Sequence, residues 1–491
     1  MPEQPVPEPL WRPSEARIEA SAMEAFRRAA EAHAGRALPD YDALHAWSVA
    51  RPEEFWELLA RYVGLPLDGQ VAEVRSSDPP PRTRWFAGAS LNYARALLYP
   101  PELADPDQLA IIAEVEDGAG TTLSYRELRD LVAAIQGSLM DLGVAEGDAV
   151  AAFAANVPET VALLLACAGL GAVFSSCSPD FGAEAAVARF SQLEPKALFV
   201  TTGYRYGGRW FDTAATVTRV ARELAGAGAS ETSLAAVVAL PYPGAEPSVP
   251  AGVERWGDFL ARAADAADRA PLLVDLPFDH PLYVLYSSGT TGTPKAMLHR
   301  AGGVLLTHAK EHLLHCDIRA GDRAFYFTTC GWMMWNWLVS ALARAATLVL
   351  YDGSPAHPEL ERPFEVAERH EVTFFGTSAR YLHTLKAAGS RPAERFDLNS
   401  IKTVASTGSP LSPAGFEYVY REVKPDVHLA SISGGTDIVG CFMLGVPTLP
   451  VYAGEIQRPG LGVDLVVLDE SGTEVSGEPG ELVCRQPLPS M

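Results

Sequence analysis

The sequence predicts an α/β fold built from at least two packed units, and three observations support this. Its 491 residues exceed the usual size of one domain, about 50–250 residues. From about residue 105, short apolar runs such as LAIIAEV, ALFV and LYVLY alternate with Ala-rich helical segments. Such alternation is typical of parallel strands joined by crossover helices. Several of the later runs end in small or polar residues, which is where open α/β sheets bind ligands.

Four segments are expected along the chain. Residues 1–104 have apolar positions at helical spacing, as in AMEAFRRAAEAHAG, and predict an N-terminal helical extension. Two α/β subdomains are expected at 105–275 and 276–449, with the loop PYPGAEPSVPAG shortly before the boundary. Residues 450–491 change pattern again, because VDLVVLDESGTEVSGEPGELVCR predicts two strands joined by a turn.

Charge limits the possible partners. The formal net charge is -22, and a surface this acidic repels nucleic acid and anionic lipid. We therefore expect small-molecule substrates, no nucleic acid and no membrane. The longest apolar block, 161–174, is interrupted by glycine and is too short for a bilayer span, which takes about 20 residues.

Cysteine usage points to a reducing compartment. The six cysteines are scattered and form no CxxC pair, so we expect free thiols and a cytoplasmic protein. The N-terminus has neither a basic region nor an apolar run, which argues against a signal peptide.

The stretch SSGTTGTPK follows the predicted strand LYVLY directly and suits a phosphate group. Its glycines let backbone N–H groups turn toward an anion, its hydroxyls are donors, and its lysine is one of only six in the chain. A polar surface turn is the plain alternative. A P-loop is excluded, because that pattern requires G-x-x-x-x-G-K-[ST]. The candidate phosphate-binding residues are Ser287, Ser288, Gly289, Thr290, Thr291, Gly292, Thr293 and Lys295.

This loop resembles the phosphate loop of the adenylate-forming acyl-CoA synthetase superfamily, [ST]-[ST]-G-[ST]-T-G-x-P-K. Three further segments resemble motifs of that superfamily and occur in its order: FFGTSARYL (374–382), STGSP (406–410) and SISGGTDIVG (431–440). One such motif alone is weak evidence, whereas four in order are specific. The resemblance implies the large N-terminal domain of the adenylate-forming fold, with two doubly wound αβα subdomains and a small β-barrel-like segment.

The resemblance also implies ATP, Mg²⁺ and coenzyme A as reactants or cofactors. Lys295 would hold the β- and γ-phosphates, Thr436 would orient the α-phosphate, and Asp437 would hold Mg²⁺, where the superfamily more often has Glu. These three are the candidate catalytic residues. The segment around 408–410 would pack against adenine. The further nucleotide-binding candidates are Gly408, Ser409, Pro410, Ser433, Gly434, Gly435 and Thr436.

A finer resemblance is to the acetoacetyl-CoA synthetase family. It rests on LWRPSEARIEASAMEAF, RWFAGASLNYARALL (84–98) and CGWMMWNWLVSALARAATLVLYDGSP (330–355). It implies an acid–thiol ligase that converts acetoacetate, ATP and CoA to acetoacetyl-CoA, AMP and pyrophosphate through an acyl-adenylate. Ligases for acetate, propionate or 3-hydroxybutyrate and a non-catalytic nucleotide-binding protein are the alternatives.

The segment GWMMWNW is expected to shape the acyl pocket, although a core aromatic cluster would explain it as well. Related acetyl-CoA synthetases have a Trp where this chain has Gly434, so the resemblance implies room for a longer acid. A keto oxygen would need a donor, which Asn336 or the Trp332 indole could supply. The candidate substrate residues are Trp332, Asn336, Gly376, Thr377 and Gly434.

Two basic residues and a histidine stripe complete the candidates. Arg205 and Arg209, in TTGYRYGGRWFD, resemble the loop that meets CoA phosphates in acetyl-CoA synthetases; a solvated loop is the alternative. His308, His312 and His315 are spaced to share one helical face. Zinc would suit such a stripe, but ordinary helix packing is the interpretation we favour.

The superfamily continues beyond the last residue of this chain, with a mobile domain that supplies a second lysine. No lysine follows Lys424 here. From the resemblance we expect the chain to lack this C-terminal domain, to bind nucleotide weakly and to adenylate poorly.

Overall fold

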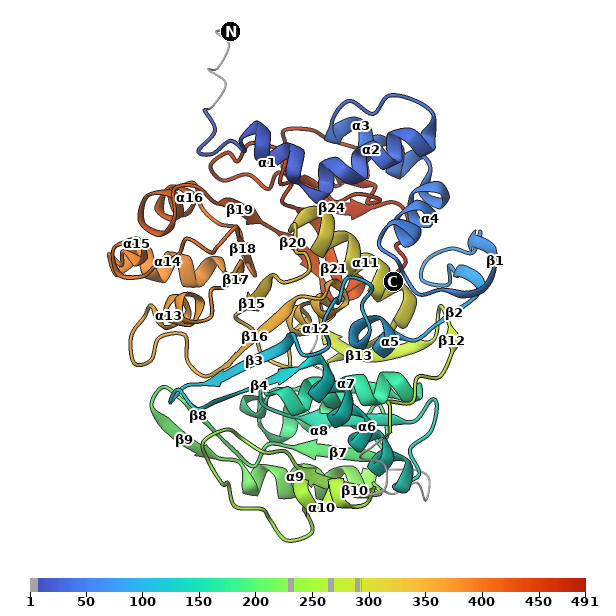
Figure 1. Cartoon of the computed structure of the whole chain (residues 1–491), viewed down its shortest axis with the longest axis vertical. Coiled ribbons are helices and arrows are strands. Elements are labelled where there is room, and N and C mark those ends of the chain that lie inside the picture. Colours follow the sequence, from blue (N-terminus) through green and yellow to red (C-terminus); the bar gives the residue numbers. More distant parts are fainter. Residues whose placement is uncertain (1–7, 228–233, 264–268, 288–291, 293) are drawn as a thin grey trace.

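The computed structural model describes residues 8–227, 234–263, 269–287, 292 and 294–491, and two seven-stranded sheets form its framework (Figure 1). The first sheet has the order β11-β10-β7-β5-β6-β13-β14. Its strands are parallel except for the edge strand β14, which pairs antiparallel with β13. The strands are β5 (Ala149–Phe153), β6 (Val173–Cys177), β7 (Ala197–Val200), β10 (Ala236–Ala239), β11 (Glu254–Arg255), β13 (Pro281–Ser287) and β14 (Lys295–Arg300).

The second sheet has the order β19-β18-β17-β15-β16-β3-β4 and repeats this plan. It is parallel except for the antiparallel edge strand β4. The strands are β3 (Leu109–Val115), β4 (Gly120–Ser124), β15 (Arg323–Tyr326), β16 (Thr347–Asp352), β17 (Phe374–Ser378), β18 (Thr403–Thr407) and β19 (His428–Ser431).

Both sheets are covered on two faces. In β7, Ala197 and Phe199 face the central cluster, whereas Leu198 and Val200 face an outer cluster with α8 (Gly182–Phe190) and α9 (Ala214–Ala227). In the second sheet, Ala405 faces the central cluster and Val404 faces outward, as the period of two in a strand requires. The outer helices there are α13 (Arg362–Arg369), α14 (Ala379–Ala387) and α16 (Pro413–Tyr418). The predicted α/β fold is confirmed.

Helices that are apolar on nearly every side contribute to the central cluster. In α7 (Pro158–Leu170) every residue except Glu159 is buried, and the helix ends at Gly171 with φ 77°. α11 (Ala301–Ala309) and α12 (Met333–Val339) are similarly buried. An all-round apolar helix belongs in a large core or a membrane, and these are core helices. Within the described residues, no helix is long and apolar enough to cross a membrane.

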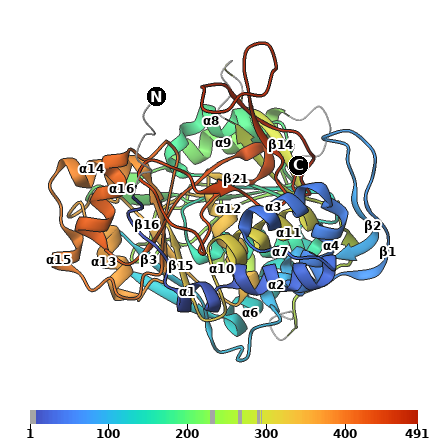
Figure 2. The ribbon, with the colours of Figure 1, turned by 90° about the horizontal axis from the view of Figure 1, so that it is seen from above.

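The N-terminal helices pack on the end of the chain. The Tyr41 hydroxyl donates to the Pro459 carbonyl oxygen at 2.6 Å, and the His45 ring nitrogen Nε2 lies 3.0 Å from the Val463 carbonyl oxygen. Figure 1 shows this helical group at the top of the molecule, at the opposite end from β7 and β10 of the first sheet, and Figure 2 shows the molecule seen from that end. The helices are α1 (Glu15–Ala20), α2 (Ala22–Ala34), α3 (Tyr41–Ala50) and α4 (Pro52–Tyr62).

The remaining elements are short. They include the sheets β1-β2-β12, β20-β21-β22, β23-β24 and β8-β9. The strands are β1 (Asp68–Arg75), β2 (Trp85–Leu91), β8 (Gly203–Tyr206), β9 (Arg209–Asp212), β12 (Leu276–Pro277), β20 (Ser433–Gly435), β21 (Gly440–Leu444), β22 (Arg458–Pro459), β23 (Leu465–Leu468) and β24 (Glu481–Cys484). The helices are α5 (Tyr93–Leu98), α6 (Tyr125–Asp141), η1 (Pro179–Phe181), α10 (Trp256–Ala261), η3 (Lys310–His315), η4 (Ser340–Arg344), α15 (Pro392–Arg395), η5 (Val419–Val423) and η6 (Thr436–Ile438).

The two large sheets exchange strand pairs along the chain. β3 and β4 fall within 105–275 but lie in the second sheet, and β13 and β14 fall within 276–449 but lie in the first. The expected division at 104, 275 and 449 stays a prediction, and each large sheet draws strands from both middle segments.

Candidate functional site

Most of the predicted site residues lie at the carboxyl ends of parallel strands. In the second sheet, Ser378 at the end of β17 is opposite Thr407 at the end of β18, and Ser406 is opposite Ser431 of β19. The segments that leave these strands therefore start at one edge of the sheet. Ligands bind at this edge in open α/β sheets, so the geometry brings 377, 408–410 and 433–437 to a suitable place.

The phosphate-loop candidate joins β13 to β14. Ser287 ends β13 and pairs directly with Lys295, the first residue of β14. Lys295 is exposed, and Gly292 has φ 111°, a conformation that L side chains rarely adopt. Residues 288–291 and Thr293, which include the other predicted phosphate ligands, lie outside the described residues.

Thr436 and Asp437 lie in a tight turn between two short strands. β20 and β21 pair antiparallel on either side of η6, and β13 lies beside η6. Thr436 is partly exposed and Asp437 is exposed. A Cβ atom at Gly434 would lie 2.1 Å from the Gly440 carbonyl oxygen, so the close approach of β21 requires glycine there, whatever the size of the acyl pocket.

His299 of β14, which was not among the predicted residues, lies near the Thr436–Asp437 turn. Its side chain is 1% exposed, and its Nδ1 lies 3.2 Å from the Ser490 carbonyl oxygen. Burial lowers the pKa of His299, and the nearby Asp437 carboxylate partly offsets that effect. The lowered pKa means that this buried imidazole is neutral near pH 7.

The start of α12 carries the acyl-pocket candidates. Trp332 occupies the N-cap position of the helix without a capping hydrogen bond from its side chain and is 64% exposed, whereas Asn336, one turn later, is 1% exposed. The buried indoles of Trp335 and Trp337 donate to Asn156 Oδ1 and Glu311 Oε2, both at 2.9 Å. These two tryptophans are core residues with satisfied N–H groups, as the alternative reading of GWMMWNW expects.

Asn336 differs from its neighbours because neither amide atom has a partner among the described residues. A buried polar group without a hydrogen bond is destabilising by roughly 1–3 kcal/mol, and such groups in folded proteins need an explanation. A ligand oxygen or an ordered water would supply the partner.

The other acyl-side candidates lie on β17. A Cβ atom at Gly376 would lie 2.1 Å from Cδ2 of Tyr326, so this glycine is required by ring packing. Thr377 is 1% exposed, and its Oγ1 has no partner among the described residues. The hydroxyl oxygens of Thr329, which follows β15, and of Ser406 in β18 also have no partner among the described residues. Neither residue was predicted. Sequence reasoning could have found them, because each follows or ends an apolar strand.

The predicted CoA residues belong to the β8–β9 hairpin. Arg205 forms an ion pair with Asp117 at 2.7 Å, and Arg209 is exposed. Glu116 accepts hydrogen bonds from the N–H groups of Gly207 and Gly208 at 2.7 and 2.6 Å, which fixes the turn between the two arginines. The hairpin is thus held in place, and Arg209 is available to an anion.

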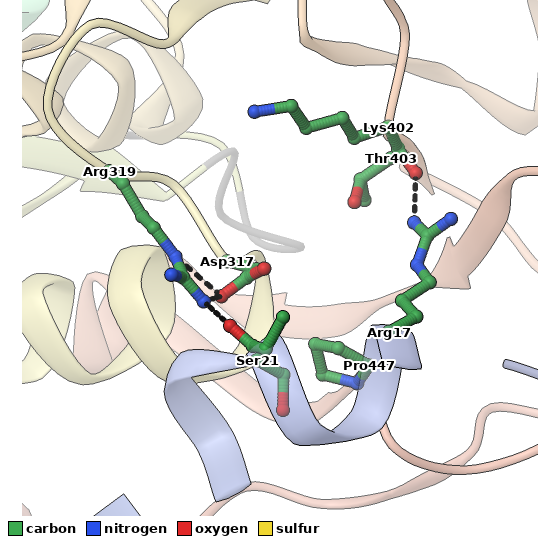
Figure 3. Close-up of a pocket in the computed structure, with 8 residues that line it drawn as sticks. Arg17, Ser21, Asp317, Arg319, Lys402, Thr403 and Pro447 are labelled. Atoms are coloured by element: carbon green, nitrogen blue, oxygen red, sulfur yellow. Dashed lines mark hydrogen bonds and ion pairs between the residues drawn. The ribbon is translucent and has the colours of Figure 1, made fainter. Parts of the chain in front are cut away.

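A cavity of about 320 Å³ lies elsewhere, between α1, the segment after η3 and the start of β18 (Figure 3). Its cations are already engaged: Arg319 bonds Asp317 at 2.7 Å, and Lys402 bonds Asp322 at 2.7 Å. None of the predicted site residues lines it. We therefore do not place the active site there.

The histidine stripe packs against other parts of the chain. Its residues lie in α11 and in the π-helix η3, where His308 and His315 bond backbone oxygens. Within the part of the chain that the structure describes, no group of three or more His, Cys, Asp or Glu side chains could hold a metal ion.

Comparison with known proteins shows which family the chain belongs to. Residues 103–491 match the model of the AMP-binding enzyme family, and residues 41–96 match that of the acetyl-coenzyme A synthetase N-terminus. The chain belongs to the AMP-binding enzyme family. Its predicted superfamily membership is confirmed.

Within the AMP-binding enzyme family, the chain belongs with the acetoacetyl-CoA synthetases. The acetoacetyl-coenzyme A synthetase of Rhizobium meliloti is 46% identical over 98% of this chain and 72% of its own length. The solved acetoacetyl-CoA synthetase of Streptomyces lividans superposes with a TM-score of 0.91 at 44% identity, covering 99% of this chain and 73% of that one. A malonamoyl-CoA synthetase of Penicillium aethiopicum is 37% identical over 96% of this chain and 68% of its own.

Members of the AMP-binding enzyme family activate acids with ATP and, in this group, pass them to CoA. The chain is accordingly an AMP-forming acyl-CoA ligase.

Proposed function

We propose that this protein activates acetoacetate with ATP and transfers it to CoA, releasing AMP and pyrophosphate. The observation that carries the proposal is that β13, which ends at Ser287 and pairs with Lys295, lies beside the turn that carries Thr436 and Asp437. The similarity to acetoacetyl-CoA synthetases over nearly the whole chain supports the choice of acid.

The proposed reaction has two steps. A carboxylate oxygen of the acid attacks the α-phosphorus of ATP, the bond from that phosphorus to the bridging oxygen breaks, and pyrophosphate leaves. The CoA thiol then loses its proton and attacks the acyl carbon, and AMP leaves with the electron pair of the broken carbon–oxygen bond. Negative charge accumulates at the phosphates in the first step, so catalysis depends on positioning and charge stabilisation.

This chain's own residues would meet those needs from fixed places. Lys295 starts β14 and is exposed, and its ammonium group would form charge-assisted hydrogen bonds with the phosphates. The Thr436 hydroxyl would donate to the α-phosphate. The exposed segment 408–410 follows β18 and would pack on adenine, and Arg209 would meet the phosphates of CoA.

A single exposed carboxylate fits Mg²⁺ at this site. Mg²⁺ usually keeps several waters and binds through one or two carboxylates together with substrate phosphates. Asp437 is exposed, so its carboxylate is accessible to such an ion. Mg²⁺ held by Asp437 would offset phosphate charge.

Asn336 supports an acid with a carbonyl at its third carbon. Acetoacetate and malonamate, the acid of the malonamoyl group, share that carbonyl and differ by a methyl against an amino group. The Asn336 Nδ2–H would donate to this oxygen, which would satisfy a buried donor that lacks a partner among the described residues. The Penicillium aethiopicum relative makes malonamate the second candidate substrate.

The location proposed for this activity is the cytoplasm. All six cysteines are free thiols in the structure, and five of them are buried, which suits a reducing compartment.

A substrate panel tests the proposal. Pyrophosphate release and ATP–pyrophosphate exchange would be measured with acetoacetate, malonamate, butyrate and acetate, each with and without CoA. Acetoacetate should give the highest kcat/KM. Preference for butyrate over both 3-oxo acids would refute the role of the carbonyl, and a lack of Mg·ATP binding in calorimetry would refute the ligase assignment for this chain.

A further inference from the structure

The helix α11 and its π-helical continuation η3 carry polar side chains that form hydrogen bonds with the backbone of residues 439–445. The His308 Nε2 lies 2.5 Å from the Val439 carbonyl oxygen, and Glu311 Oε1 accepts the Cys441 N–H at 2.9 Å. Farther along, His315 Nδ1 lies 2.8 Å from the Gly445 carbonyl oxygen. All three side chains are at most 1% exposed. The segment they hold begins directly after the Thr436–Asp437 turn.

The turn ends in an unfavourable backbone conformation, which neighbouring residues must hold in place. Val439 has φ 43°, in the left-handed region, and a β-branched residue is a real outlier there. Such a conformation is destabilising and persists only where the surroundings determine it. His308 bonds the carbonyl of this residue, and Glu311 bonds the N–H two residues later.

The direction of the hydrogen bonds at His308 follows from its charge state. Burial lowers the pKa of His308 to about 3, so the ring is neutral and has one N–H. The Val439 oxygen can only accept, so Nε2 carries the proton and Nδ1 accepts from the Ser340 hydroxyl at 2.8 Å, with the Asn336 carbonyl oxygen as a second acceptor of that hydroxyl at 3.1 Å. Ser340 in turn accepts from the Tyr93 hydroxyl at 2.7 Å.

The same two side chains also hold α12 and its continuation. Ser340 starts η4 directly after α12, and Trp337 of α12 donates its indole N–H to Glu311 Oε2 at 2.9 Å. Glu311 thus accepts one N–H from each side, and Lys310 Nζ lies 3.7 Å from its Oε1. One rigid helix therefore connects the element that carries Asn336 with the turn that carries Asp437.

We propose that His308 and Glu311 form a backbone clamp, a pair of positioning residues that set the Thr436–Asp437 turn relative to α12. The clamp rests on the proposed function, because it would align the phosphate side of that active site with its acyl side. It assigns a role to His308 of the histidine stripe and to Glu311. Both side chains are buried and would act through the turn and α12.

The test compares His308→Leu with His308→Gln and with the matched control His315→Leu. His315 is equally buried on the same helix, but it holds Gly445, eight residues after Asp437. Gln keeps a donor for Val439 and an acceptor for Ser340. The readouts are amide hydrogen exchange in 436–445, Mg·ATP affinity by calorimetry, and kcat and KM for ATP–pyrophosphate exchange with acetoacetate.

We expect His308→Leu to speed hydrogen exchange around 436–441 and to lower kcat by about 10- to 100-fold, since small misplacements of reacting groups have effects of that size. KM for acetoacetate should change less than kcat, and His308→Gln should recover most of the loss. His315→Leu should lower stability and leave kcat within about threefold. Equal losses of kcat in both leucine variants, or normal kcat in folded His308→Leu, would overturn the proposal.

A second variant covers failure to fold. Ser340→Ala keeps the imidazole but removes its Nδ1 donor, and it should shift the same readouts in the same direction by a smaller factor. Unchanged hydrogen exchange at 436–441 in folded Ser340→Ala and Glu311→Gln would overturn the clamp. If the unmodified chain binds no Mg·ATP, the proposed function fails, while hydrogen exchange still decides whether the clamp exists.

Discussion

Ser287 and Lys295 are direct partners in the antiparallel pairing of β13 with β14, although residues 288–294 separate them in the chain. The loop therefore returns its lysine to the point where the loop starts. β13 also lies beside η6, so the strand that ends at Ser287 borders the turn that carries Asp437. The strand pairing fixes the backbone of Lys295 at the edge of the sheet. A fixed backbone position helps a charged side chain to meet a phosphate in the right geometry.

Replacing Lys295 with Ala should weaken Mg·ATP binding by about 10- to 100-fold, the range expected for one charge-assisted hydrogen bond. Calorimetric titration of ATP with Mg²⁺ measures this directly. Lys386→Ala is the matched control, because Lys386 is an exposed lysine on α14, outside the predicted site. Equal affinity of the Lys295 and Lys386 variants would contradict the phosphate-loop assignment.

The sequence predicted the strands that carry the motifs, because each motif follows a short apolar run with a clear end. The run LYVLY lies in β13, FFGTS forms β17, and VHLASIS contains β19 and the segment that follows it. Strand partners were not predictable in the same way. β3 and β4 join the second sheet across more than 200 residues of chain, through a β3–β16 pairing that no local pattern encodes.

The sequence predicts only part of the candidate site, because some of its contacts also depend on strand pairing. Gly434 was read as space for a longer acid, but its packing against the Gly440 carbonyl oxygen depends on a strand pairing that the sequence does not display. The histidine spacing indicated a shared helical face, yet the partners of that face are backbone atoms at 439–445. Backbone partners leave no residue-type signature, so Glu311 and His308 could not be recognised as a pair.

Replacing Asn336 with Leu should lower kcat/KM for acetoacetate by about tenfold, because a buried hydrogen bond to the keto oxygen would be lost. Butyrate has the same carbon chain without that oxygen, so its kcat/KM should stay constant or rise. The ratio of the two values, measured by pyrophosphate release, separates recognition from general damage. Parallel losses for both acids would show that Asn336 supports the fold and does not read the keto group.

Buried histidines should make the protein sensitive to acid. Burial lowers the pKa of His308 and His315 to about 3 and that of His428 to about 4. The unfolded chain binds protons at these groups below about pH 6.5 while the folded chain does not, so their stabilisation is complete above that pH and is lost as pH falls toward 4. Each group contributes a slope of about 1.4 kcal/mol per pH unit in that window.

Urea unfolding at pH 7.5, 6.0, 5.0 and 4.5 measures this slope, and His428→Gln should reduce it by one group's share. The Gln side chain retains a donor for Gln457, which His428 contacts at 2.9 Å. The same slope in the variant and the parent protein would show that His428 is protonated in the folded state.

Asp352 should have the opposite pH dependence. It ends β16 and accepts the Asn156 N–H at 2.9 Å and the Tyr242 hydroxyl at 3.1 Å, both from the first α/β unit. Burial raises the pKa of Asp352 to about 6, although both donors favour the carboxylate. A carboxyl group with a raised pKa stabilises the fold below its unfolded pKa, near 3.9, and that contribution is lost as pH rises through about 6.

Asp352→Asn removes this titration and keeps an acceptor for Asn156, with an amide that can donate to the Tyr242 oxygen. Relative to the parent protein, its free energy of unfolding should therefore increase steadily between about pH 4 and pH 6, by at most about 3 kcal/mol. Because the histidines titrate in the same range in both proteins, the difference between the two unfolding curves isolates Asp352. A difference that is constant with pH would mean that Asp352 is ionised in the folded protein throughout this range.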